Sequence, residues 1–165
     1  MAAKENFIIS LSTDPDDWGL CAGIMAKTDP WITLGMNYDK CLLSFEGSYR
    51  EVYVMKREDK ITGFVILQLK GTFSGYIQTL CIDEAWGGHG LGTMLLTFSQ
   101  QKILQFSPNI FICVSSFNKR AMKLYYDFGF SLVGELEDFV VKGYSEFLMR
   151  KTVGPRIGYT GYSNN

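Results

Sequence analysis

Glycines cluster in one short stretch of the chain, and their spacing could bind phosphate. Four of them fall within residues 87–92: Gly87, Gly88, Gly90 and Gly92. The residues before them, 76–82, are apolar and β-branched as in a buried strand. The residues after them, 91–98, place apolar side chains on one helical face. A glycine-rich turn that leads into a helix leaves N–H groups unpaired at the positive end of the helix dipole, which favours phosphate.

Two common phosphate loops do not fit this stretch. No Gly-Lys-Ser/Thr ends it, so it is not a Walker A loop. The glycines do not have the G-x-G-x-x-G spacing, and no acidic residue follows about twenty positions later, so the dinucleotide fingerprint is absent. A flexible surface turn that is rich in glycine remains the alternative.

Apolar runs and breakers divide the rest of the chain into alternating strands and helices. Strands are expected at 6–11, 51–57, 61–70, 76–82, 110–114, 130–141 and 144–151, with the last two turning at Lys142-Gly143. Helices are expected after Asp14-Pro15, over 37–45, after the glycine loop, and from Asn118 to Gly129. The predicted order is β-α-α-β-β-β-α-β-α-β-β, an α/β domain over residues 1–151. Residues 152–165 have no periodicity, and we expect them to be a flexible C-terminal tail.

Composition excludes several classes of function. The 165 residues carry a formal net charge of -1 without a basic cluster, so no nucleic-acid partner is expected. No apolar run approaches eighteen residues and no signal peptide is evident, which predicts a cytoplasmic protein without a membrane partner. The four cysteines have neither metal-site nor disulfide spacing, so we expect reduced, mostly buried thiols and no metal.

A second motif follows the glycine loop after one intervening strand. It comprises Asn118, Ala121, Leu124, Tyr125, Gly129 and Phe130. It is similar to N-x-x-A-x-x-L-Y-x-x-x-G-F of the GCN5-related N-acetyltransferase (GNAT) family, closest to the N-terminal amine (ribosomal-protein alanine) acetyltransferase branch. The glycine loop resembles the acyl-CoA loop of that family, Gln/Arg-x-x-Gly-x-Gly/Ala, except that Gly87 stands where Gln or Arg is usual. The resemblance covers roughly residues 51–151.

The resemblance implies a fold and a reaction. The fold is a mixed, mostly antiparallel sheet of about seven strands, whose central parallel pair splays around the acyl-CoA site. The reaction is acetyl transfer from acetyl-CoA to a primary amine of a small molecule or of a peptide or protein, by direct attack. The residues implied to bind the cofactor are Leu80, Cys81, Ile82, Gly87, Gly88, His89, Gly90, Leu91, Gly92, Thr93, Asn118, Ala121 and Tyr125.

Individual roles also follow from the resemblance. Backbone N–H groups of 80–82 would polarise the thioester carbonyl, and those of the glycine loop would hold the pyrophosphate. Asn118 would bond the pantetheine arm, although it could be only a helix cap. Tyr125 would protonate the leaving thiolate, although it could be only a core tyrosine.

The general base is not identified by the sequence. In the N-terminal acetylating branch a glutamate often stands on the strand before the asparagine helix, and the matching residue here is Cys113. Cys113 could form an acyl-enzyme or could be a buried strand thiol. His89 lies in the phosphate loop, so it is expected to be a phosphate neighbour or an exposed side chain. Several acidic residues lie nearby in the element order, and a base acting through water is also open. They are Asp83, Glu84, Glu135, Glu137 and Glu146.

The acceptor side of the site is less defined. We expect the entrance between the first two helices and the last hairpin, with Trp31, Glu137 and Tyr144 as substrate residues and Asp29 beside them. The amine itself is not specified, and the last strands could form the edge of a homodimer. The alternative function is a non-catalytic acyl-CoA-binding or sensing domain, since the family's loop Gln/Arg and strand glutamate are both missing.

Overall fold

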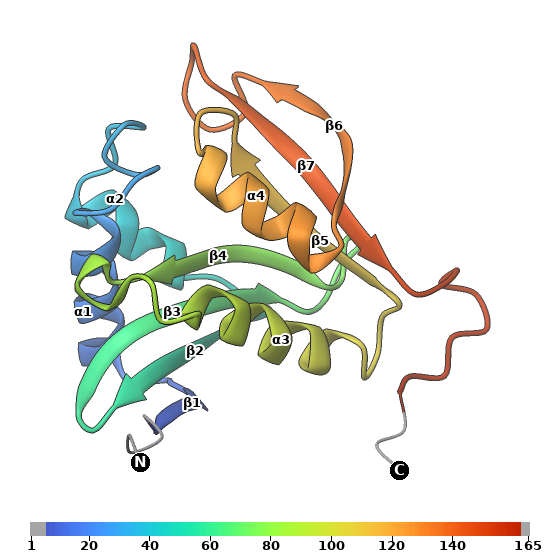
Figure 1. Cartoon of the computed structure of the whole chain (residues 1–165), viewed down its shortest axis with the longest axis horizontal. Helices are drawn as coiled ribbons and strands as arrows, with labels where there is room; N and C mark the ends of the chain where they lie inside the picture. Colours follow the sequence, from blue (N-terminus) through green and yellow to red (C-terminus); the bar gives the residue numbers. More distant parts are fainter. Residues whose placement is uncertain (1–5, 163–165) are drawn as a thin grey trace.

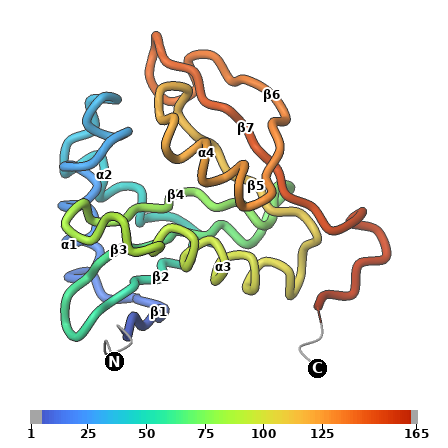
Figure 2. The backbone as a smooth tube through the Cα atoms, viewed as in Figure 1, coloured from blue at the N-terminus to red at the C-terminus, as the bar shows by residue number. Residues whose placement is uncertain are grey.

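The computed structural model describes residues 6–162, within which seven strands form one sheet in the order β1-β2-β3-β4-β5-β7-β6 (Figure 1). The strands are β1 (Phe7–Leu11), β2 (Arg50–Arg57), β3 (Lys60–Gln68), β4 (Tyr76–Ile82), β5 (Asn109–Ser115), β6 (Ser131–Glu137) and β7 (Ser145–Thr152). The helices are α1 (Pro15–Met25), α2 (Tyr38–Leu42), α3 (Leu91–Ile103) and α4 (Lys119–Phe128), with short 3-10 helices η1 (Leu43–Phe45) and η2 (Glu84–Trp86). Figure 2 follows the same path as a continuous tube.

Helices cover the sheet on both faces because its central strands are apolar on both sides. Side chains alternate along a strand, so Phe64 of β3 packs with α1 and α2 while its neighbour Val65 packs with α3. The same alternation holds in β2, where Val54 and Met55 belong to the two different clusters. In Figure 1, α3 and α4 lie in front of the sheet. The central strands of the sheet therefore form a buried layer between two apolar clusters.

The sheet confirms the predicted fold class. Every neighbouring pair of strands is antiparallel except β4 and β5, which are parallel and joined through α3. The predicted element order agrees with the observed order. The predicted helix over 37–45 is present as α2 followed directly by η1, with the Asn37 side chain accepting the Lys40 N–H at 3.0 Å.

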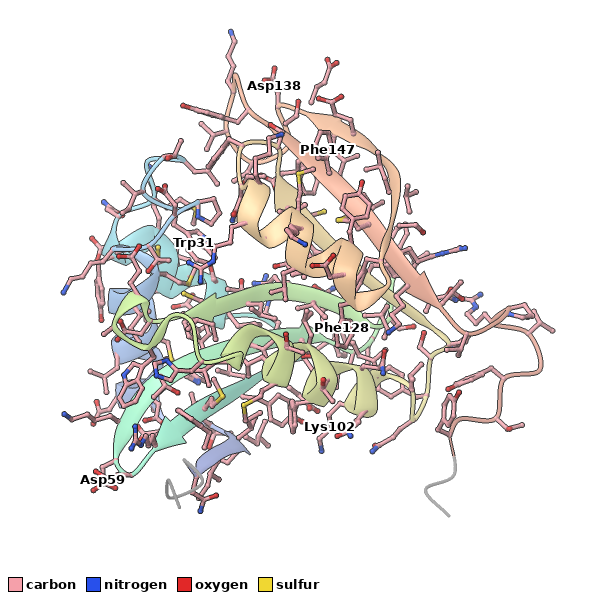
Figure 3. All side chains as sticks on the ribbon, in the orientation of Figure 1. Trp31, Asp59, Lys102, Phe128, Asp138 and Phe147 are labelled. Carbon is pink, nitrogen blue, oxygen red and sulfur yellow. The ribbon has the colours of Figure 1, made fainter. Side chains whose placement is uncertain are left out.

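The last hairpin differs from the prediction. The strand expected over 130–141 ends at Glu137, and residues 138–144 form a connection rather than a tight turn. Asp138, labelled at the top of Figure 3, has a φ of 52° and its carboxylate accepts the Gly143 N–H at 2.6 Å. This local loop competes with strand pairing. Phe139 and Val140, which suggested a strand, are 57% and 49% exposed.

The segment after β7 contacts the end of α3 within the described residues. The Tyr162 N–H donates to the Leu104 carbonyl oxygen at 3.0 Å, and the Tyr159 hydroxyl donates to the same oxygen. Leu104 caps the C-terminus of α3, where carbonyl groups lack helix partners. Residues 153–162 therefore satisfy part of that helix end. No helix among residues 6–162 is long and apolar enough to cross a membrane.

Candidate active site

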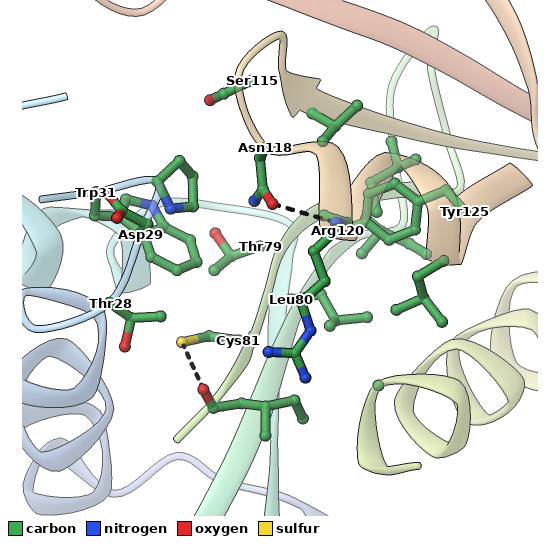
Figure 4. Close-up of a pocket in the computed structure, with 18 of the residues that line it drawn as sticks. Thr28, Asp29, Trp31, Thr79, Leu80, Cys81, Ser115, Asn118, Arg120 and Tyr125 are labelled. Carbon is green, nitrogen blue, oxygen red and sulfur yellow. Dashed lines mark hydrogen bonds between the residues drawn. The ribbon is translucent and has the colours of Figure 1, made fainter. Parts of the chain in front are cut away.

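The two parallel strands separate partway along their length. β4 and β5 pair only at Tyr76 with Phe111 and at Ile77 with Ile112. Beyond these pairs, at the carboxyl ends of both strands, a cavity of about 670 Å³ opens. Such a position, at the carboxyl ends of parallel strands, is where open α/β sheets bind ligands, and the volume suits a small-molecule ligand. Figure 4 shows the cavity in close-up.

The glycine loop forms one wall of the cavity. The Asp83 side chain caps η2 by accepting the Ala85 N–H at 3.0 Å, and the chain then turns through Gly88 and Gly90, whose φ values are 82° and 72°. Gly90 is the N-cap of α3 and offers no side-chain hydrogen bond to it. The first N–H groups of α3 thus have no helix partner and are available to an anion.

Gly92 lets the loop helix approach α4. A Cβ atom at this position would lie 2.9 Å from Leu124 Cδ2. Gly92 and Leu124 belong to the two motifs that the sequence singled out, so the motifs meet in space. The close contact fixes the start of α3 beside α4, and both line the cavity.

The asparagine of the second motif begins α4 from the edge of the cavity. Its Oδ1 accepts the Ala121 N–H at 3.2 Å, which makes Asn118 the N-cap, as predicted. The amide nitrogen remains a donor for another group. Asn118, labelled in Figure 4, and Ala121 both line the cavity.

Tyr125 lies in the cavity wall with only 5% of its surface exposed. Its ring packs against Phe130 at a centroid distance of 6.0 Å. Burial raises the pKa of its hydroxyl, and the nearby Cys81 and Glu146 raise it further. The hydroxyl therefore keeps its proton at neutral pH and is a hydrogen-bond donor.

The cavity brings together most of the residues that the sequence predicted for cofactor binding. Those that line it are Leu80, Cys81, Ile82, Gly87, Gly88, Gly90, Leu91, Gly92, Thr93, Asn118, Ala121 and Tyr125. His89 is exposed and does not line it. His89 Nδ1 lies 3.1 and 3.0 Å from the carbonyl oxygens of Trp86 and Gly87. Both partners accept, so Nδ1 carries the ring proton and ties the loop together.

The acceptor side of the cavity is only partly as expected. Asp29 and Trp31, from the segment between α1 and α2, line it. Trp31 is labelled in Figures 3 and 4. Glu137 and Tyr144 do not line it; the Tyr144 ring packs against Phe117 at 5.4 Å instead. Their place is taken by Phe139 and Val140 from the connection between β6 and β7.

Cys113 lines the cavity in an uncharged form. Burial raises the pKa of its thiol, while a hydrogen bond with Tyr76 acts in the opposite direction and Glu146 raises the pKa again. A thiol is a nucleophile only as the thiolate. This environment therefore favours a strand thiol over an acyl-enzyme.

Two charged residues of the cavity were not selected by the sequence. Glu146 of β7 lies opposite Ser115 of β5, is 6% exposed and accepts the Ser115 hydroxyl at Oε1. Arg120 of α4 lines the cavity, and one guanidinium nitrogen lies 3.9 Å from the position of a Cβ on Gly87. Strand register and side-chain reach decide both placements. The only signal for Arg120 in the sequence is its position two residues after Asn118.

Solved structures share this fold at low sequence identity. The ribosomal-protein-S18-alanine N-acetyltransferase from Escherichia coli aligns with a TM-score of 0.72 at 17% identity, covering 96% of this chain and 100% of its own. An aminoglycoside 6'-N-acetyltransferase complexed with coenzyme A aligns with a TM-score of 0.70 at 17% identity, covering 90% and 98%. The protein yncA from Salmonella typhimurium, solved with its cofactor acetyl-CoA, aligns with a TM-score of 0.66 at 16% identity, covering 93% and 97%.

Sequence comparison identifies the family directly. No curated protein is significantly similar to this chain in sequence. The family model described as the acetyltransferase (GNAT) family matches residues 11–130, which include the glycine loop and the motif that begins at Asn118. The chain therefore belongs to the GNAT acetyltransferase family.

Proposed function

We propose that this chain transfers an acetyl group from acetyl-CoA to a primary amine of a small molecule or of a peptide or protein. One observation carries the proposal. The same cavity is lined by the first residues of α3, whose N–H groups have no helix partner, by the buried Tyr125, and by Trp31 and Phe139. These parts suit a phosphate-bearing thioester on one side and an acceptor on the other. The domain that carries them is residues 1–151.

Acetyl-CoA fits the groups that line the cavity. The N–H groups from Gly88 to Thr93 would hold the pyrophosphate at the positive end of α3. Arg120, labelled in Figure 4, would add the cation that the loop lacks at Gly87, because its guanidinium lies 3.9 Å from the position of a Cβ on that glycine. The free amide N–H₂ of Asn118 would donate to the pantetheine arm. When bound, acetyl-CoA supplies an activated acyl carbon and a thiolate leaving group.

The chain's own groups would assist direct attack by the amine. Backbone N–H groups of 80–82 would donate to the carbonyl oxygen as it gains negative charge. Tyr125 would donate to the sulfur as the carbon–sulfur bond breaks. By holding the thioester between these groups, the cavity walls would supply orientation, which can account for much of the rate. The reduced nucleophilicity of Cys113 supports direct attack over a covalent intermediate.

A thermal-shift titration with acetyl-CoA, CoA, ATP and NAD tests the proposal. A ligand at about 100 times its dissociation constant should add roughly 2.7 kcal/mol of stability. We expect stabilisation by acetyl-CoA and CoA and none by ATP or NAD, followed by CoA release when amines are added. Stabilisation without CoA release from any amine would instead support a non-catalytic acyl-CoA-binding domain. No stabilisation by acetyl-CoA or CoA would overturn both functions.

A further inference from the structure

A buried carboxyl group, that of Glu146, lines the cavity. Glu146 and Ser115 are direct partners across the β5–β7 ladder, so their side chains lie on the same face of the sheet. Both line the cavity, and both are buried, with 6% and 2% of their surfaces exposed. A glutamate is seldom buried without a partner because its charged form loses its hydration. The burial of Glu146 beside the cavity therefore suggests a functional role for its carboxyl group.

The surroundings of Glu146 leave its charge without a cation. The Ser115 hydroxyl donates to one of its oxygens, and Cys113, Tyr76 and Tyr125 interact with it electrostatically from β5, β4 and α4. None of these groups is positively charged. The ion pairs found among residues 6–162 do not include Glu146. The cavity is thus the side from which a positive charge can reach this carboxylate.

We propose that Glu146, held by the Ser115 hydroxyl, is the catalytic base that takes a proton from the acceptor amine. This inference rests on the proposed function, since it concerns the amine that the acetyl group would reach. The family resemblance points to the strand position of Cys113 for a base, and a thiol there cannot serve as a carboxylate does. The neighbouring strand β7 supplies the carboxylate to the same cavity instead.

The protons balance along this route. Amines arrive as ammonium ions, because the pKa is about 10.4 for a lysine side chain and about 7.7–8.0 for an α-amine. Glu146 takes one proton, so a nitrogen–hydrogen bond breaks and an oxygen–hydrogen bond forms. The freed lone pair forms the carbon–nitrogen bond, and the carbon–sulfur bond breaks with its electron pair on sulfur. Tyr125 gives its proton to sulfur and regains one from the new amide nitrogen, while Glu146 returns its proton to water.

The environment also suits a base that works near neutral pH. Burial raises the pKa of the Glu146 carboxyl above its ordinary value, and the Ser115 hydrogen bond acts in the opposite direction. A catalytic carboxylate is most effective when its pKa lies near the operating pH, because it then gains driving force while remaining ionised. Ser115 therefore sets how far the pKa rises, as a positioning residue.

Glu146→Gln tests the assignment, with Glu137→Gln as a matched control on a glutamate that does not line the cavity. The probes are acetyl-CoA with an alanine-initiated peptide or with N-acetyl-lysine amide, followed by CoA release from pH 5.5 to 9.5. We expect kcat/KM of Glu146→Gln to fall by about 10²–10⁴-fold at pH 7. Its rate should rise about tenfold per pH unit as free amine forms. The inflection that ionisation of Glu146 gives to the acidic limb of the wild-type profile should be absent.

If Glu146→Gln fails to fold, acetyl-CoA will not stabilise it against heat. Ser115→Ala then gives a second test of the assignment. Removing the hydroxyl takes away a hydrogen bond that lowers the pKa of Glu146, so the acidic limb should move to higher pH. An unchanged limb in Ser115→Ala, or wild-type kinetics in Glu146→Gln, overturns the assignment while the transferase proposal stands. A wild-type chain that releases no CoA with any small-molecule or peptide amine removes the reaction, and the assignment with it.

Discussion

Tyr125 is buried and lines the cavity, and its hydroxyl is protonated. We therefore expect Tyr125→Phe to bind acetyl-CoA as tightly as the wild type, since the ring and its packing against Phe130 are kept. Turnover should fall by about 10²–10⁴-fold, because the thiolate would leave without a proton donor. Acetyl-CoA titration and the rate of CoA release measure the two effects.

The neighbouring Tyr126 provides the control for this prediction. It is exposed and does not line the cavity, so Tyr126→Phe should leave both measurements unchanged. Unchanged turnover in Tyr125→Phe would show that the buried hydroxyl is only a core group.

Residues whose roles depend on local backbone chemistry could be located from the sequence. The glycines of the loop and the cap at Asn118 follow from short-range rules, and the cavity contains both. Glu146 could not be selected, because only the pairing of β7 with β5 places it opposite Ser115. Arg120 was missed for a similar reason. Its long side chain lies near Gly87, more than thirty positions earlier in the sequence, only because α4 packs beside the glycine loop.

At the scale of elements, α4 lies close enough to the glycine loop for its Arg120 to replace the cation that is missing at Gly87. We expect Arg120→Gln to weaken acetyl-CoA binding by about tenfold, as for a lost charged hydrogen bond at an accessible site. S-acetyl-pantetheine lacks the pyrophosphate, so its affinity should not change. Adding Gly87→Arg should restore acetyl-CoA binding, because residue 87 has an ordinary φ of -59°. Its Cβ would lie 3.3 Å from the Glu84 carbonyl oxygen, which requires a small shift.

The tail arginine serves as the matched control for this series. Arg156 is exposed and lies outside the cavity, so Arg156→Gln should bind acetyl-CoA like the wild type. An equal loss for acetyl-CoA and S-acetyl-pantetheine in Arg120→Gln would place the guanidinium away from the pyrophosphate.

The start of α4 separates a structural role from a binding role in one side chain. Asn118→Ala should lower the free energy of unfolding by about 1 kcal/mol through the lost cap. Asn118→Asp retains a capping oxygen and places negative charge at the helix N-terminus, so its stability should stay near that of the wild type. Both variants lose the amide donor, and both should bind acetyl-CoA more weakly. Urea unfolding measures the capping role of Asn118, and acetyl-CoA titration measures its binding role. If Asn118 is only a cap, Asn118→Asp should bind acetyl-CoA like the wild type.

Across the whole molecule, the order of elements was predictable because strand and helix periodicities are strong in the central strands and in α3. The splay of β4 from β5 was expected only through the family resemblance, since no residue of either strand specifies where pairing stops. The connection between β6 and β7 was wrongly assigned to a strand. Its apolar residues Phe139 and Val140 have strand propensity, but the turn held by Asp138 keeps them out of the sheet. Tertiary position, not local propensity, makes them part of the cavity mouth.

The stability of the folded chain should record the burial of Glu146. Because burial raises the pKa of this carboxyl in the native state, the native state binds more protons than the unfolded state at pH values above the unfolded pKa of about 4.3. The contribution of Glu146 is therefore most favourable at low pH and is lost as pH rises through the native pKa. Glu146→Gln removes this titration, so its free energy of unfolding relative to the wild type should increase between pH 4 and pH 8.

Urea unfolding of the wild type, Glu146→Gln and Glu137→Gln across this range isolates the effect. Glutamine changes the hydrogen bond with Ser115 by an amount that does not depend on pH, so only the slope reports the buried charge. The exposed Glu137 has no comparable environment, and its variant should run parallel to the wild type. A Glu146→Gln difference that stays constant with pH would mean that the carboxyl has the same pKa in the native and the unfolded chain. The charge of the carboxylate would then already be compensated by groups of the free chain. A compensated carboxylate would not attract the ammonium group of an acceptor. Urea unfolding therefore tests the catalytic assignment in the absence of any acceptor amine.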